Sequence, residues 1–132
     1  MKFPFRILAL LAMLTLGASA ADISGAWKLR VTGGVIHMTI AYATFQFQID
    51  GSSLTGTAHI GDSYPGTAPI SEGRVEGDRL SFKVVGRSPS SNGVPVMTFH
   101  GAIRGDHIKL TMHLIDGYVD AGDTELAGER LN

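Results

Sequence analysis

Apolar and polar residues alternate along most of the chain after its first twenty positions, and clusters of Gly, Pro, Asn, Asp and Ser interrupt the alternation. A period of two residues is typical of β-strands with one buried face. The pattern predicts eight strands, at residues 23–31, 35–49, 52–60, 70–76, 79–85, 96–104, 107–115 and 124–131. A turn is expected at 32–34, and longer loops at 61–69, 86–95 and 116–123. No helix is predicted, so we expect an all-β protein.

The second of these strands changes phase once. Apolar residues occupy positions 36, 38, 40 and 42, whereas Phe45, Phe47 and Ile49 follow with the opposite parity. A shift of one residue turns every later side chain to the other face of a sheet. The pattern therefore predicts a β-bulge near residues 41–44.

Short turns join three pairs of strands and predict β-hairpins. Asp50-Gly51 is typical of a type I′ turn, and Gly77-Asp78 and Gly105-Asp106 are typical of type II′ turns. Two-residue pairing around these turns places apolar residues opposite one another, as in Val75–Leu80, Ile103–Ile108, Phe99–Met112 and Phe47–Leu54. The same pairing brings opposite charges together in Glu72–Lys83 and Glu76–Arg79, which also favours these registers.

Short turns and long loops alternate along the chain. In an up-and-down meander, all the short turns then lie at one end and all the long loops at the other. Closing such a sheet removes its unpaired edges, so we expect an eight-stranded antiparallel barrel. Its interior is wide enough to be filled by side chains or to hold one small ligand. A two-sheet β-sandwich of the same strands is the alternative.

The first twenty residues have the pattern of a secretory signal peptide. Lys2 and Arg6 give a positive start, residues 7–16 are apolar, and Ala18-Ser19-Ala20 is a small-residue cleavage site. The apolar stretch is too short to span a bilayer. We expect export to the periplasm or the outside of the cell, with a signal peptide at 1–20 and one barrel domain at 21–132.

The composition of residues 21–132 limits the kinds of partner that the protein is expected to bind. Without Lys2 and Arg6, nine of the 11 basic residues stand against 12 acidic ones, and this net charge of −3 argues against nucleic acid. Cysteine is absent, so packing must hold the domain without disulfides. No second long apolar run predicts a membrane-spanning helix. An outer-membrane barrel is an alternative, but it needs an apolar outward face, and here the non-apolar parity carries charges and histidines.

Residues in the first and last predicted strands resemble those of the calycin group, which includes lipocalins, avidins and bacterial lipocalin-like barrels. Gly25-Ala26-Trp27 resembles the Gly-x-Trp of their first strand, and Arg130 resembles the arginine that stacks on that tryptophan. The resemblance implies structural roles for Trp27 and Arg130 at the base of a barrel. The chain lacks the helix of lipocalins and the several pocket tryptophans with which avidins bind biotin. The resemblance therefore implies a barrel and a ligand inside it, without implying biotin.

Two groups of polar residues are candidates for chemistry. The five histidines share the polar parity of their strands, and His100 and His113 are expected to be diagonal neighbours that could share a proton or a metal. A solvated outer face is the alternative interpretation. Asp116, Asp120 and Asp123 could bind calcium or form an ordinary polar turn. Neither group has the spacing of a metal-binding motif, so we predict no metal site and no cofactor. The remaining histidines are His37, His59 and His107.

No Gly-x-Ser-x-Gly elbow or phosphate-binding loop is present, so the sequence does not favour an enzyme. A small-barrel isomerase or hydrolase remains an alternative, as does a protein-interaction module that could include a homo-oligomer.

Methionine and phenylalanine residues share the apolar parity and could line an adaptable pocket. A solid core is the alternative. Residues of the long loops could orient or gate a ligand. We predict that the protein binds a small apolar or amphipathic molecule in the barrel or at its mouth, through Met38, Phe45, Tyr64, Phe82, Arg87, Met97, Phe99, Met112 and Tyr118.

Overall fold

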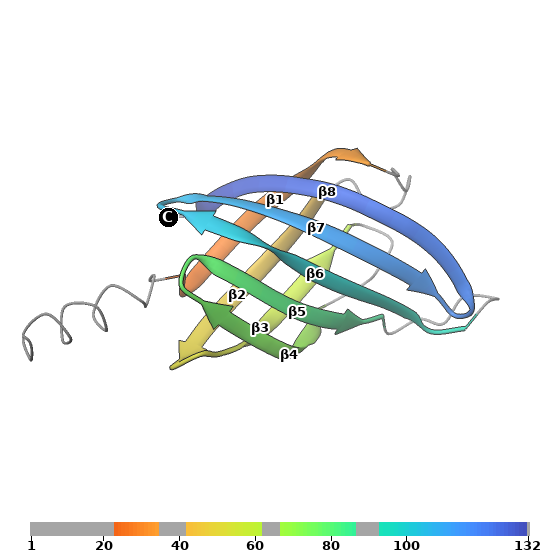
Figure 1. Ribbon diagram of the computed structural model, residues 1–132, viewed down its shortest axis with the longest axis horizontal. Coiled ribbons are helices and arrows are strands. Elements are labelled where there is room, and N and C mark those ends of the chain that lie inside the picture. The colour runs from red at the N-terminus through yellow and green to blue at the C-terminus, as the bar shows by residue number, and fades with distance from the viewer. Residues whose placement is uncertain (1–22, 35–41, 62–66, 87–92, 132) are drawn as a thin grey trace, which may run out of the picture.

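Eight antiparallel strands follow one another around a closed barrel, in which β8 pairs with β1 (Figure 1). The computed structural model describes residues 23–34, 42–61, 67–86 and 93–131. The strands are β1 (Gly25–Gly34), β2 (Tyr42–Asp50), β3 (Ser53–Ile60), β4 (Ala68–Glu76), β5 (Arg79–Val85), β6 (Pro95–Arg104), β7 (His107–Asp116) and β8 (Val119–Leu131). The predicted all-β meander and its closure into a barrel are confirmed, and the sandwich alternative is wrong. No helix in the described part of the chain is long and apolar enough to cross a membrane.

Four two-residue turns connect neighbouring strands, and each begins with a glycine at positive φ, between 61° and 68°. These turns are Gly51-Ser52, Gly77-Asp78, Gly105-Asp106 and Gly117-Tyr118. Among the described residues only Glu72 combines a side chain with positive φ, so the second turn residue stays at negative φ, as a type II′ turn requires. The two predicted type II′ turns are confirmed. The turn near residue 50 is also of this type and not type I′.

The third predicted long loop is wrong. Residues 116–123 contain a two-residue turn, and β8 already begins at Val119. This turn therefore lies at the opposite end of the barrel from the other three. We call the end with the turns at 51–52, 77–78 and 105–106 the tight-turn end, and the opposite end the loop end. In Figure 1, β6, β7 and β8 reach furthest toward the loop end.

Most of the predicted registers hold. Val75 faces Leu80, Ile103 faces Ile108, and Phe99 faces Met112. The Phe47–Leu54 pairing is wrong: Leu54 faces Ile49, because the turn is centred one residue later than expected. Around Glu72 a register shift separates the pairs on either side, so Glu72 does not face Lys83, although the two side chains form an ion pair at 2.8 Å.

The first two strands also differ from their predicted limits. β1 continues through Gly33 and Gly34, where a turn was expected. Residues 35–41 lie outside the described residues, and so does most of the predicted phase change. From Tyr42 onward, the pairing of β2 with both neighbours is regular. The bulge expected near residues 41–44 is therefore not found in the described part of β2. Register shifts occur instead between β1 and β8, β3 and β4, β4 and β5, and β7 and β8.

The alternating pattern turns apolar side chains inward and charged ones outward. Four phenylalanines form the centre of the core, with neighbouring ring centroids 4.7–5.5 Å apart. These rings belong to Phe45, Phe47, Phe82 and Phe99, and all are buried. Offset and edge-on ring contacts of this kind add to the free energy gained by burial.

The barrel base is closed by Trp27 and Arg130. The Arg130 guanidinium lies 4.5 Å from the centre of the Trp27 ring system, and the two residues are paired between β1 and β8. Arg130 Nη1 donates to the Ser24 carbonyl at 2.6 Å, and its Nε donates to Asp106 Oδ1 at 3.1 Å. The Trp27 indole N–H donates to the Ile23 carbonyl at 2.9 Å. The contact expected from the calycin resemblance is present.

Candidate functional site

Inward-facing side chains change in size along the barrel. Trp27, Leu54 and the four phenylalanines occupy the part nearer the tight-turn end, and they are buried. Toward the loop end, several strands turn small residues inward instead, and the facing pair Ala58–Ala68 joins two of these strands. The small inward residues of the described strands are Ala43, Ala58, Ala68, Ala121 and Gly122. Larger aliphatic side chains are buried at this end as well, namely those of Ile60, Ile70, Val84, Met97 and Leu114. Among the described residues, the loop-end half of the interior is therefore lined by aliphatic side chains, alanine and glycine, whereas the aromatic rings lie nearer the tight-turn end.

Exposed apolar side chains lie on the β5–β8 side of the loop end. Five of the six large hydrophobic residues exposed among the described residues lie there, and Leu131 is the sixth. Backbone pairing and a 3.3 Å hydrogen bond from Gly117 N–H to the Val94 carbonyl bring their segments together. We call these residues the apolar rim: Val85, Val94, Ile115, Tyr118 and Val119.

The structure divides the predicted ligand-binding residues among three places. Phe45, Phe82 and Phe99 belong to the packed half of the core. Met97 is buried nearer the loop end, and Met112 is buried opposite Phe99, between the two halves. Tyr118 is 83% exposed in the β7–β8 turn and forms part of the apolar rim. The others, Met38, Tyr64 and Arg87, lie outside the described residues.

Thr124 is a polar residue that sequence reasoning did not select. It is fully buried, and no other polar or charged residue in the described part of the chain is buried. It pairs with Met112 on β7 and with Gly34 on β1, so it belongs to the loop-end half of the interior. The sequence does contain a signal for its burial: Thr124 lies two residues before the apolar Leu126, and residues two apart in a strand face the same side.

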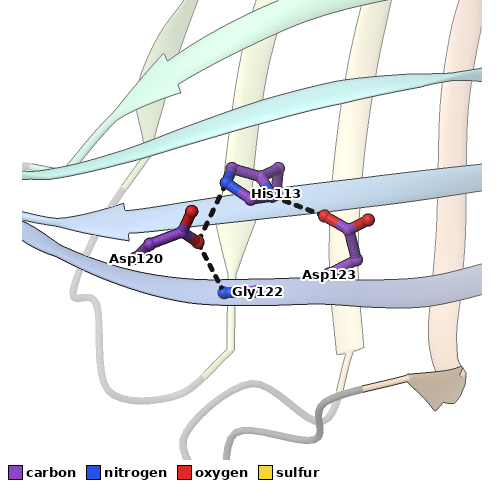
Figure 2. Close-up of polar contacts among 4 residues, drawn as sticks. All are labelled: His113, Asp120, Gly122 and Asp123. Atoms are coloured by element: carbon purple, nitrogen blue, oxygen red, sulfur yellow. Dashed lines mark hydrogen bonds and ion pairs between the residues drawn. The ribbon is translucent and has the colours of Figure 1, made fainter.

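The β7–β8 hairpin holds an imidazole between two carboxylates (Figure 2). His113 Nδ1 lies 2.5 Å from Asp123 Oδ1, and its Nε2 lies 3.0 Å from Asp120 Oδ1. The Asp120 oxygen also accepts the Gly122 backbone N–H at 3.0 Å. We call His113, Asp120 and Asp123 the histidine clamp. In a regular strand, residues 120 and 123 would face opposite sides, but the register shift at Ala121 places both on the outer wall.

The clamp corrects two interpretations of the sequence. His113 pairs with Thr98 as predicted and is diagonal to His100, but its ring nitrogens contact β8 carboxylates. Asp120 and Asp123 belong to β8 and not to a loop. The described residues contain no group of three His, Cys, Asp or Glu side chains placed to hold a metal ion.

Protonated His113 can donate from both ring nitrogens, so the clamp favours its charged form. The hydrogen bond to Asp123 raises the pKa of His113 above its ordinary value of 6.5, and the charge of Asp120 adds to this, while desolvation opposes it. The stabilising contribution of the clamp is therefore fully present in mildly acidic solution below pH 6.5, where His113 is protonated. It is lost as the pH rises through the raised pKa of His113.

Two measurements check this pH dependence. In NMR titrations, the midpoint of the His113 imidazole should lie above 6.5, and Asp123→Asn should lower it. In thermal unfolding, the melting temperature of the wild type should exceed that of His113→Gln at mildly acidic pH, and the difference should shrink in alkaline solution. An unchanged midpoint in Asp123→Asn would contradict the clamp.

Comparisons with solved structures find two crystal structures of shwanavidin, one of a variant in complex with biotin and one of the ligand-free protein. The first is 16% identical to this chain with a TM-score of 0.55, and covers 83% of this chain and 99% of its own. The second is 14% identical with a TM-score of 0.55, and covers 83% of this chain and 98% of its own. No protein-family model and no curated protein matches the sequence.

These matches assign the fold. The chain is a small eight-stranded antiparallel barrel, and its fold is similar to that of shwanavidin.

Proposed function

We propose that this protein is an exported barrel that binds a small apolar or amphipathic molecule in the loop-end half of its interior. The observation that carries the proposal is the change along the interior from aromatic rings to a mixture of aliphatic side chains, alanine and glycine. The apolar rim supports it, because an exposed apolar surface at a pocket mouth favours the entry of such a molecule. The signal-peptide pattern of residues 1–20 supports export.

The lining residues indicate the chemistry of the ligand. Met97 and Met112 offer flexible apolar contacts, and Thr124 is the one buried hydroxyl among the described residues. No His, Asp or Glu side chain of the described strands is buried, so a ligand with a deeply placed charge would find no partner there. The structural neighbour shwanavidin was crystallised with biotin. Here the single tryptophan is buried at the barrel base beneath Arg130, so we propose a ligand less polar than biotin.

Filling the proposed site should abolish binding. Ala58→Leu places a larger side chain into the loop-end half, whereas Thr57→Leu changes the adjacent, outward-facing residue and serves as the matched control. Fluorescence titration with the apolar probe anilinonaphthalene sulfonate, and native mass spectrometry with a panel of apolar small molecules and biotin, would measure binding. We expect binding by the wild type and Thr57→Leu, and at least a tenfold loss in Ala58→Leu.

Stability measurements on the same variants show whether the interior is open. A free space accepts the added carbons, so Ala58→Leu should leave the free energy of unfolding unchanged or raise it. A filled interior would instead be overpacked, at a cost of about 1–3 kcal/mol. That cost, or undiminished binding by Ala58→Leu, would contradict the proposed site.

A further inference from the structure

A row of cationic side chains crosses the outer wall of the barrel. Arg79 on β5 pairs with Ala102 on β6, which pairs with Lys109 on β7, then Ala127 on β8 and Arg30 on β1. Strands lie about 4.8 Å apart, so neighbouring cations in this row are roughly 10 Å apart. Alanine methyl groups occupy the wall between them. We call Arg79, Lys109 and Arg30 the basic row.

The wall is hollowed along this row. A depression of about 530 Å³ includes Arg79, Lys109 and both alanines. A second of about 320 Å³ adjoins it at Arg79 and includes Arg74, and a third of about 350 Å³ adjoins it at Ala127 and includes Arg30. The three depressions share lining residues, so together they form one shallow groove across six strands, from β4 to β8 and on to β1.

Two inward-facing glycines, Gly101 on β6 and Gly128 on β8, lie among the residues of the groove. A Cβ atom on Gly101 would lie 1.9 Å from the Lys109 carbonyl oxygen, and one on Gly128 would lie 1.9 Å from the Lys28 carbonyl oxygen. The neighbouring strands therefore approach too closely for any side chain at these two positions.

The charges in the groove are unbalanced. None of the ion pairs among the described residues includes Arg79, Lys109 or Arg30. Acidic residues lie at the groove ends: Glu76 faces Arg79 across the strands and lies 3.8 Å from Arg74, and Glu129 lies 3.8 Å from His107. Glu125 also lines the middle depression, two residues nearer the loop end than Ala127. The basic row thus offers three positive charges although the chain as a whole is acidic.

We propose that this groove binds an acidic polysaccharide, laid across the strands with its carboxylates on the basic row. The spacing favours a polymer with widely separated charges, because nucleic acid carries a phosphate about every 3.4 Å along each strand. The flat alanine surface between the cations leaves room for uncharged sugars. A planar anionic membrane would meet the acidic remainder of this convex wall, which disfavours it.

The experiment uses the mature chain and a fluorescently labelled hyaluronan oligosaccharide, whose carboxylates lie on alternate sugars, in fluorescence anisotropy at low ionic strength. The double variant Arg30→Ala/Lys109→Ala should weaken binding at least tenfold. The control Lys83→Ala/Arg104→Ala removes the same charge elsewhere on the outer wall and should change binding less than threefold. Higher salt should weaken wild-type binding, because these charges are exposed.

Backbone NMR shifts of the wild type provide a second measurement that needs no variant. We expect the oligosaccharide to shift outward positions of β1, β7 and β8 around Ala127, and not the interior. Absence of binding, equal weakening by both double variants, or stronger binding to DNA or anionic vesicles than to the oligosaccharide would overturn the proposal. Because the readout lies on the outer wall, these outcomes are independent of ligand binding inside the barrel.

Discussion

Phe82→Ala should lower the free energy of unfolding by about 3–5 kcal/mol, the largest stability effect that we expect from a single substitution. Phe82 stacks on Phe99 with ring centroids 4.7 Å apart, and it contacts Phe45 and Phe47 edge-on at 5.3 and 5.5 Å. Removing the ring leaves a cavity among three rigid neighbours. Total stability of small domains is about 5–15 kcal/mol, so the variant is expected to be close to unfolding at physiological temperature.

Urea denaturation followed by circular dichroism measures this loss. Gln46→Ala is the matched control, because Gln46 lies between Phe45 and Phe47 on the same strand but faces solvent. We expect it to change stability by no more than about 0.5 kcal/mol. A loss below about 1 kcal/mol in Phe82→Ala would mean that the four rings do not form a close-packed core.

Arg130→Ala should cost about 2–3 kcal/mol, because it removes several contacts of one partly buried cation. The guanidinium covers Trp27 and donates to Asp106 and to the Ser24 carbonyl. Arg130→Lys retains a cation near the indole but loses the planar fork that reaches both acceptors, so we expect only partial recovery.

Chemical denaturation and Trp27 fluorescence would follow the change at the base. The control is Arg104→Ala, because Arg104 is exposed at the same end of the barrel and belongs to none of the ion pairs among the described residues. It should stay within about 0.5 kcal/mol of the wild type. Equal losses in the two variants would indicate a general charge effect, and would contradict a specific role for Arg130.

The barrel could be predicted from the sequence because the signals for it involve residues close together in the chain and recur in every strand. Alternation assigned the strands, and cross-strand pairs such as Val75–Leu80 confirmed their neighbours within a few residues. The β2–β3 register failed for an equally local reason. Asp50-Gly51 and Gly51-Ser52 both contain the required glycine, and only the observed pairing of Asp50 with Ser53, with Asp50 outside the positive-φ region, distinguishes them.

The histidine clamp could not be predicted in the same way. The glycines and aspartates of residues 116–123 resemble a loop, which concealed the turn at Gly117-Tyr118 and the early start of β8. An extra residue at Ala121 then places Asp120 and Asp123 on one face, against simple alternation. The Trp27–Arg130 contact joins residues that are more than one hundred positions apart in the sequence. It could therefore be expected from the family resemblance and not from a local pattern.

The central claim is that a small molecule occupies the loop-end half of the interior. NMR of the protein with labelled methionine methyl groups, titrated with anilinonaphthalene sulfonate, tests it most directly, because Met97 is buried there and Met112 is buried at its inner boundary. We predict intermolecular nuclear Overhauser effects from the probe to both of these methyl groups. Probe contacts restricted to outward-facing residues, with both methionine signals unchanged, would contradict the account.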